Sequence, residues 1–284
     1  MGRVVTTRAP VAFITGASRG IGKAIAVHMA RAGFDVAIAA RTIHDGEARE
    51  HSSTVRASDM SPLPGSLSST ATLVETTGRQ ATAVYLDLND RASLAAAVSK
   101  VLDIYGRIDV LVNNARYVGP GHMDRILDTP IELLDKHLEA NAVAPVILTQ
   151  LVLPGMLARG NGCLITLTSK AGIVNPPAPA GEGGWSLGYA ASKAAVIRLA
   201  GIIDVEHRKD GIRAFNLNPG VINTERIAID MGAFGFEPTG ASPDVIGAAA
   251  AWLATSPDAD QYLGQWVEGQ DLCRDLHLLD EANP

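Results

Sequence analysis

Tyr189 and Lys193 stand four residues apart in the segment Gly-Tyr-Ala-Ala-Ser-Lys. In a helix, this spacing places a phenol and an ammonium group on one face, within reach of a common substrate. A phenol has a pKa of about 10 and exchanges protons poorly at neutral pH, but a neighbouring positive charge favours the phenolate and lowers that pKa. The pair is therefore a candidate acid–base catalyst, although an isolated pair of this kind is more often a packed tyrosine and a solvated lysine.

The scaffold that would position this pair is indicated by short apolar runs, rich in β-branched residues, that alternate with helical patterns. Such alternation predicts a parallel sheet with helices on both faces. We therefore expect an α/β fold, a doubly wound Rossmann-like domain with seven strands, and ligands at the carboxyl ends of those strands. The expected strands are Val11 to Thr15, Phe34 to Ala40, Ala81 to Leu86, Ile108 to Val112, Cys163 to Thr168, Ile212 to Leu217 and Leu263 to Val267.

The chain of 284 residues is interpreted as one domain over residues 10–284, preceded by a flexible tail at residues 1–9. Polar stretches at about residues 42–65 and 171–188 interrupt the alternation, and the first looks inserted because a strand-to-helix turn normally takes only a few residues. The segment at about 221–242 has the composition of an apolar lid over a substrate, or of an ordinary cover for the core. Its apolar residues include Ile227, Ile229, Met231, Phe234 and Phe236, and Trp185 could close a pocket from the other side.

A glycine-rich turn, Gly-x-x-x-Gly-x-Gly, follows the first apolar run, and its glycines are Gly16, Gly20 and Gly22. Glycines let the backbone approach a pyrophosphate closely, and the N-terminus of the next helix offers unpaired N–H groups with partial positive charge. The turn therefore predicts a dinucleotide site. An alternative is the nucleophile elbow of a serine hydrolase centred on Ser18, with His207 or His277 as partner, although only one strand can precede Ser18.

Arg41 ends the second expected strand, where an NAD-binding domain commonly carries a carboxylate for the ribose 2′-hydroxyl. A guanidinium there can instead pair with a 2′-phosphate, and Arg19 in the glycine turn could join it. We therefore expect NADP(H) to be preferred, while NAD(H) stays an alternative.

Four motifs in order resemble those of the short-chain dehydrogenase/reductase family, and the likeness runs from about Pro10 to about Gly269. A narrower resemblance is to 3-oxoacyl-carrier-protein reductases. The family resemblance implies an NADP(H)-dependent enzyme that interconverts a carbonyl and a secondary alcohol on a moderately apolar small molecule. The motifs are the glycine turn from Thr15 to Gly22, the segment Asn113-Asn114-Ala115, Ser169, and the pair Tyr189 and Lys193.

The resemblance also implies a catalytic tetrad of Asn141, Ser169, Tyr189 and Lys193. In reduction, Ser169 would hold the carbonyl oxygen while Tyr189 hands over a proton. Lys193 would bond the cofactor ribose, and Asn141 would link Lys193 to solvent through an ordered water, unless Asn141 merely breaks a helix. Cofactor contacts are implied for Gly16, Ser18, Arg19, Gly20, Ile21, Gly22, Arg41, Asp87, Leu88, Asn114, Ala115, Tyr189, Lys193, Pro219, Gly220, Ile222 and Thr224.

The chain departs from the family at Arg116, where a glycine usually completes the Asn-Ala motif. Some relatives that lost the catalytic tyrosine or lysine act as nucleotide sensors, and a non-catalytic NADP-binding sensor is the rival interpretation. Relatives usually assemble as tetramers, so a homotetramer or homodimer is expected.

Composition excludes several other classes. The formal net charge is −6 without a basic run, which disfavours nucleic acid as a partner. Cys163 and Cys273 give neither a disulfide framework nor metal-ligand spacing, so no metal is expected. The N-terminus lacks the apolar stretch of a signal peptide, and the apolar runs look too short and interrupted to span a bilayer. A cytoplasmic enzyme is therefore the expectation, with no membrane partner.

Overall fold

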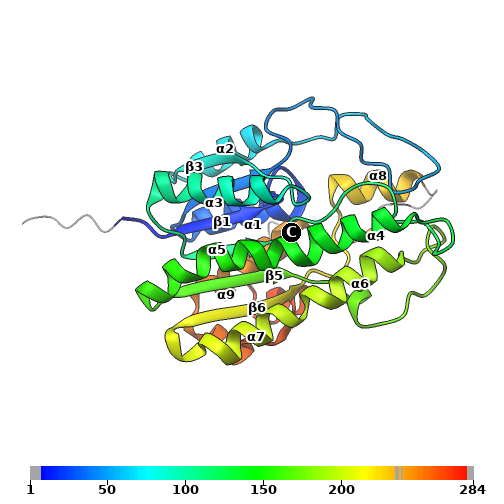
Figure 1. The fold of residues 1–284 in the computed structure, drawn as a ribbon. Helices are drawn as coiled ribbons and strands as arrows, with labels where there is room; N and C mark the ends of the chain where they lie inside the picture. Colours follow the sequence, from blue (N-terminus) through cyan, green and yellow to red (C-terminus); the bar gives the residue numbers. More distant parts are fainter. Residues whose placement is uncertain (1–7, 234–236, 238, 280–284) are drawn as a thin grey trace, which may run out of the picture.

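The computed structural model describes residues 8–233, 237 and 239–279, and its centre is a single sheet of seven parallel strands. The strand order is β3-β2-β1-β4-β5-β6-β7, so the winding reverses between β1 and β4 (Figure 1). This arrangement confirms the expected doubly wound, Rossmann-like fold. The strands are β1 (Val11–Thr15), β2 (Asp35–Ala40), β3 (Ala81–Tyr85), β4 (Val110–Asn113), β5 (Gly162–Leu167), β6 (Ile212–Asn218) and β7 (Trp266–Glu268).

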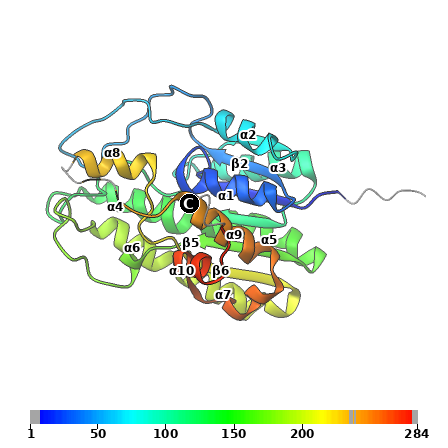
Figure 2. The ribbon, with the colours of Figure 1, turned by 180° about the vertical axis from the view of Figure 1, so that it is seen from behind.

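Helices cover both faces of the sheet (Figure 2). Successive side chains of a strand point to opposite faces, so Ala12 and Ile14 of β1 join one core while Val11 and Phe13 join the other. The first core is completed by α1, α2, α9 and α10, and the second by α3, α5 and α7. The α-helices are α1 (Gly20–Arg31), α2 (Leu67–Glu75), α3 (Arg91–Tyr105), α4 (Ile131–Leu138), α5 (Ala144–Arg159), α6 (Leu187–Val196), α7 (Arg198–His207), α8 (Glu225–Ala233), α9 (Pro243–Thr255) and α10 (Gly269–Asp275).

Several expected strand ends shift by one to three residues. Phe34 was expected in β2, but its N–H donates to the carbonyl of Met29 and so closes the end of α1. Leu263 was expected in β7, but its N–H donates to Asp260 at the end of a 3-10 turn. The paired register of β7 with β6 begins at Trp266, although the Gly264 N–H already donates to the Ala214 carbonyl at 2.8 Å.

One helical run corrects the expectation that every apolar run is too short to cross a membrane. Residues Ile131–Arg159 form 29 continuous helical residues with a mean hydropathy of 1.6 over the most apolar stretch, which is enough by length and composition alone. Half of that stretch is buried inside the protein, and buried core helices of soluble proteins can have the same length and composition. The run is therefore weak evidence for a membrane segment.

Candidate cofactor and catalytic site

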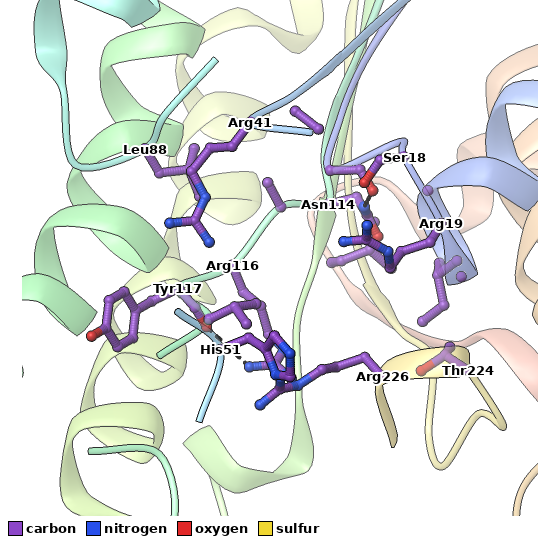
Figure 3. Close-up of a pocket in the computed structure, with 18 of the residues that line it drawn as sticks. Ser18, Arg19, Arg41, His51, Leu88, Asn114, Arg116, Tyr117, Thr224 and Arg226 are labelled. Atoms are coloured by element: carbon purple, nitrogen blue, oxygen red, sulfur yellow. Dashed lines mark hydrogen bonds between the residues drawn. The ribbon is translucent and has the colours of Figure 1, made fainter. Parts of the chain in front are cut away.

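The carboxyl ends of the central strands surround a cavity of about 290 Å³ (Figure 3). It lies where the strand order reverses, which is the usual place for a ligand in this class of fold. Every residue that the sequence singled out for cofactor contact lines it: Gly16, Ser18, Arg19, Gly20, Ile21, Gly22, Arg41, Asp87, Leu88, Asn114, Ala115, Tyr189, Lys193, Pro219, Gly220, Ile222 and Thr224.

The glycine turn is packed so tightly that side chains would not fit. Gly16 has a φ of +70°, and a Cβ on Gly22 would lie 2.2 Å from the Gly16 carbonyl oxygen. Asn114 fixes the turn to β4, because its Nδ2 donates to the Thr15 carbonyl at 2.8 Å. Because these glycines carry no side chains, a ligand in the cavity can approach the backbone at the N-terminus of α1 closely. This arrangement suits the pyrophosphate of a dinucleotide.

The two arginines expected at a 2′-phosphate have different surroundings. The Arg19 guanidinium donates to the carbonyls of Pro64 at 2.8 Å and Gly65 at 2.7 Å, so it holds the end of the inserted segment. Arg41 stands at the end of β2 and points into the cavity (Figure 3). Arg41 is therefore the better placed of the two to meet a phosphate.

The inserted segment, residues 42–65, contains no helix or strand and forms a long loop that passes from the end of β2 toward α8 (Figure 1). Asp124 is buried and accepts hydrogen bonds from the Thr54 hydroxyl at 2.6 Å and the Val55 N–H at 2.9 Å. On the α8 side, Arg226 donates to His51 Nδ1 at 2.7 Å. The insertion therefore forms part of the wall of the cavity, with six residues that the sequence did not single out: Thr42, Glu47, Arg49, His51, Ser61 and Leu63.

Tyr189 and Lys193 both line the cavity from α6. This helix begins where the Ser186 hydroxyl accepts a hydrogen bond from the Tyr189 N–H at 3.3 Å, which fixes the first turn. Lys193 is 5% exposed, and its Nζ donates to the Leu167 carbonyl at 2.7 Å. Burial, assisted by the positive charge of Arg116, lowers the pKa of Lys193 to about 7. An anionic ligand in the cavity would favour the protonated form.

Asn141 does not break its helix but lies in a π-helical turn, Glu139–Val143, that joins α4 to α5. Its Oδ1 accepts a hydrogen bond from the Tyr117 N–H at 2.6 Å, and its Nδ2 donates to the Ser192 hydroxyl at 3.0 Å. Ser192 in turn donates to the Tyr189 carbonyl at 3.0 Å. In the described part of the chain the Asn141 side chain does not bond Lys193, and a link through water stays a prediction.

Ser169 is half-buried and follows Thr168, which lines the cavity, but Ser169 itself is not among the lining residues. Its hydroxyl accepts a hydrogen bond from the Ala171 N–H at 3.2 Å and so caps a 3-10 turn. The hydroxyl still has its proton to donate to a substrate oxygen.

A line of rings leads away from Tyr189. The His122 ring lies edge-on to Tyr189 with centroids 4.7 Å apart, and His137 lies 4.7 Å from Tyr117. Burial, with a smaller contribution from Arg116, lowers the pKa of His137 to about 4 and that of His122 well below its usual value. Both imidazoles are therefore neutral at neutral pH. No motif marks these histidines in the sequence.

Other expectations about the site are corrected or fall outside the description. Trp185 lines a second cavity beside α6 rather than the cofactor cavity. Ile227 of α8 does line the cofactor cavity, whereas Phe234, Phe236 and the side chain of Met231 lie outside the described residues. Among the residues that the structure describes, no group of three His, Cys, Asp or Glu side chains could hold a metal ion.

The structure removes one of the two histidines that the hydrolase alternative could use. Ser18 lies at the carboxyl edge of the sheet, directly after β1, whereas His207 ends α7 and precedes β6 at the opposite edge. There the His207 ring bonds Asp210 at 3.0 Å. His207 therefore cannot act as a base for Ser18.

Comparison with known proteins agrees with this geometry. The model of the short chain dehydrogenase family matches residues 10–58 and 56–229. The chain is 31% identical over 219 residues to human dehydrogenase/reductase SDR family member 7, which covers 75% of this chain and 56% of that protein, so the chain spans little more than half the length of this curated relative.

Two solved structures share the fold over nearly the whole chain. A metagenomic short-chain oxidoreductase in complex with NADP has a TM-score of 0.68 at 27% identity, and covers 91% of this chain and 95% of its own. A short chain dehydrogenase from Mycobacterium paratuberculosis bound to NAD has a TM-score of 0.73 at 26% identity, with 93% and 98% covered. Because the family model matches most of the chain, this protein belongs to the short-chain dehydrogenase family.

Proposed function

We propose that the protein is an NADP(H)-dependent oxidoreductase that interconverts a carbonyl and a secondary alcohol. The observation that carries this proposal is that Tyr189 and Lys193 line the same cavity as the glycine turn at the N-terminus of α1. A proton donor thus lies in the cavity that would hold a dinucleotide. The binding of NADP and NAD by the two solved relatives supports a nicotinamide cofactor.

The proposed roles of Tyr189 and Lys193 follow from these positions, and that of Ser169 from the family resemblance. The nicotinamide, when bound, supplies or accepts the hydride. The Tyr189 hydroxyl donates its proton to the carbonyl oxygen during reduction and accepts it back during oxidation. The Lys193 ammonium bonds the ribose hydroxyls and stabilises the phenolate that remains. The Ser169 hydroxyl orients the carbonyl oxygen, and Asn141 holds α6 through Ser192.

The test is a spectrophotometric assay with NADPH and a panel of ketones, aldehydes and a 3-oxoacyl thioester. Oxidation of NADPH supports the proposed enzyme, whereas tight binding of NADPH without oxidation of any substrate would favour the sensor. Ester hydrolysis without cofactor would favour the hydrolase that the position of His207 already argues against.

The preference for NADP(H) is proposed to depend on Arg41. Arg41→Asp replaces a cation with the carboxylate that commonly selects the 2′-hydroxyl of NAD, so NADPH should bind about 10- to 100-fold more weakly while NADH is affected much less. Fluorescence titration of both cofactors measures this change. Arg31→Asp on the exposed end of α1 is the matched control and should bind both as the wild type does. Equal affinity of Arg41→Asp and wild type for NADPH would remove Arg41 from the phosphate site.

Assembly and location are also proposals. Exposed apolar side chains on α5 and α7, among them Leu151, Ile202 and Val205, are of the kind that a subunit interface covers. We propose a homotetramer or homodimer in the cytoplasm, which light scattering and cell fractionation would test.

A further inference from the structure

Helix α8 forms part of the cavity wall without being packed into the core. Thr224, which directly precedes α8, lines the cavity, and so do Arg226 and Ile227. Of the side chains of α8 that the structure describes, none belongs to either hydrophobic core. An element with so little buried apolar surface opens at a low free-energy cost, so polar contacts decide where α8 lies.

Two consecutive residues at the start of α8 make these polar contacts. The Glu225 carboxylate accepts hydrogen bonds from the Gly20 N–H at 3.0 Å and from the Lys23 ammonium at 2.7 Å, which ties α8 to the N-terminus of α1. Arg226 is only 8% exposed, and its Nη1 donates to His51 Nδ1 at 2.7 Å. The first turn of α8 is therefore tied to the cofactor side of the cavity and also to the inserted segment.

The contacts of His51 determine which of its ring nitrogens carries the proton. His51 is 3% exposed, and its Nε2 lies 2.9 Å from the Ser61 carbonyl oxygen, which can only accept. Nε2 therefore carries the hydrogen, and Nδ1 is the acceptor that a guanidinium needs. A second acceptor, the Ser53 hydroxyl, lies 2.8 Å from Arg226 Nη2. Figure 3 shows the His51 and Arg226 side chains pointing toward each other.

The part of the inserted segment that carries His51 is itself fixed to the loop that follows β4. The Met123 N–H donates to the Ser53 carbonyl at 2.8 Å. The buried Asp124 carboxylate accepts from the Thr54 hydroxyl and, within its own loop, from the Gly121 N–H at 2.9 Å. These contacts give His51 a support that does not depend on α8, so its hydrogen bond can determine the position of α8.

We propose that His51 is a positioning residue, which acts through Arg226 to hold the first turn of α8, and with it Ile227, as a preformed wall of the cavity. This inference rests on the function proposed above. A wall that is ordered before the substrate arrives need not be ordered on binding, and this lowers KM. Tyr189 and Lys193 belong to α6, which the contact does not touch, so the chemical step should be insensitive to it.

The first experiment needs no substrate and compares three replacements of His51. Asparagine keeps an acceptor oxygen at the place of Nδ1, glutamine places its amide at the place of Nε2, and leucine has no polar atom. Hydrogen exchange of the backbone amides of residues 225–233 is followed by mass spectrometry in the cofactor-free proteins. We expect exchange at least about tenfold faster in His51→Leu and His51→Gln, and close to the wild-type rate in His51→Asn.

The second experiment measures steady-state kinetics with the best carbonyl of the panel. His51→Leu should raise KM about 5- to 20-fold while kcat stays within about twofold, and His51→Asn should restore KM. Partial misfolding would instead lower kcat and leave KM unchanged, because fewer molecules would be active. The matched control is His44→Leu in the same inserted segment. His44 is exposed, its ring bonds the Ser68 hydroxyl at 3.1 Å, and it does not line the cavity, so this variant should behave as the wild type.

The outcomes separate this inference from the proposed function. Wild-type protein that oxidises NADPH with no carbonyl would overturn the function, and the exchange experiment would still test the contact between His51 and α8. Exchange of α8 in His51→Leu at the wild-type rate, or an unchanged KM, would overturn the positioning role alone. If His51→Leu does not fold, the pair His51→Gln and His51→Asn decides, and equal exchange of α8 in these two variants would refute the role of the Nδ1 acceptor.

Discussion

Replacement of Tyr189 by phenylalanine is expected to lower kcat/KM by about a thousandfold, because the substitution removes the hydroxyl that moves the proton. Phenylalanine keeps the ring that lies 4.7 Å from His122, and the start of α6 depends on the backbone N–H of this residue rather than on its hydroxyl. Folding and NADPH affinity should therefore match the wild type. Steady-state kinetics with the best carbonyl of the panel, together with a fluorescence titration, measure both quantities.

The control makes the same chemical change elsewhere. Tyr105 is buried at the end of α3, its hydroxyl bonds Thr82 at 2.8 Å, and neither residue lines the cavity. Tyr105→Phe should lower the free energy of unfolding by roughly 1 kcal/mol and leave kcat/KM near the wild-type value. If Tyr189→Phe turned over as fast as Tyr105→Phe, another group would have to supply the proton.

The fold was predictable because its signals are local and repeated. Most strands are short buried runs, and their order along the chain, with a glycine turn after the first, restricts the topology to a doubly wound sheet. The strand ends were less predictable, since Phe34 is as apolar as the strand beside it and only its hydrogen bond to Met29 places it with α1. Asn141 illustrates the same limit, because a π turn lets the helix continue through a residue that usually disfavours helix.

The parts of the site that escaped prediction depend on contacts between distant segments. No feature of the sequence near Thr54 indicates its hydrogen bond to Asp124. This contact helps to fix the position of the insertion beside the cavity. The contacts of Arg19 depend on the course of the same insertion, because its guanidinium donates to the carbonyls of Pro64 and Gly65. Two sequence features indicated these parts of the site: the polar insertion after β2, and the arginine in place of glycine at position 116. Neither feature identifies a ligand.

Lys193→Met is expected to lower kcat/KM by about a thousandfold and, at the same time, to stabilise the cofactor-free protein. The loss of activity follows from removing the charge that stabilises the Tyr189 phenolate. The gain in stability follows from the position of Lys193, which is 5% exposed in a site whose burial lowers its pKa from 10.5 to about 7. Methionine fills a similar volume without a charge to desolvate.

The gain in stability of Lys193→Met over the wild type depends on pH. Between about pH 7 and pH 10.5 the unfolded chain holds a proton on Lys193 that the folded protein has released, so the free energy of unfolding of the wild type rises with pH across that window. The cost of burying the ammonium is therefore fully present below pH 7 and disappears as the pH approaches 10.5. At about 1.4 kcal/mol per pKa unit the cost is on the order of a few kcal/mol.

Urea denaturation of the cofactor-free proteins at pH 6 and pH 9 measures this difference. The variant should exceed the wild type in free energy of unfolding by roughly 1–3 kcal/mol at pH 6, because the lost hydrogen bond to Leu167 offsets part of the gain, and the difference should shrink at pH 9. Lys209→Met, at an exposed position after α7, should change neither activity nor the pH dependence. Equal pH dependence of Lys193→Met and wild type would show that the ammonium is not buried in the absence of cofactor, and its role would then have to be created by the ligand.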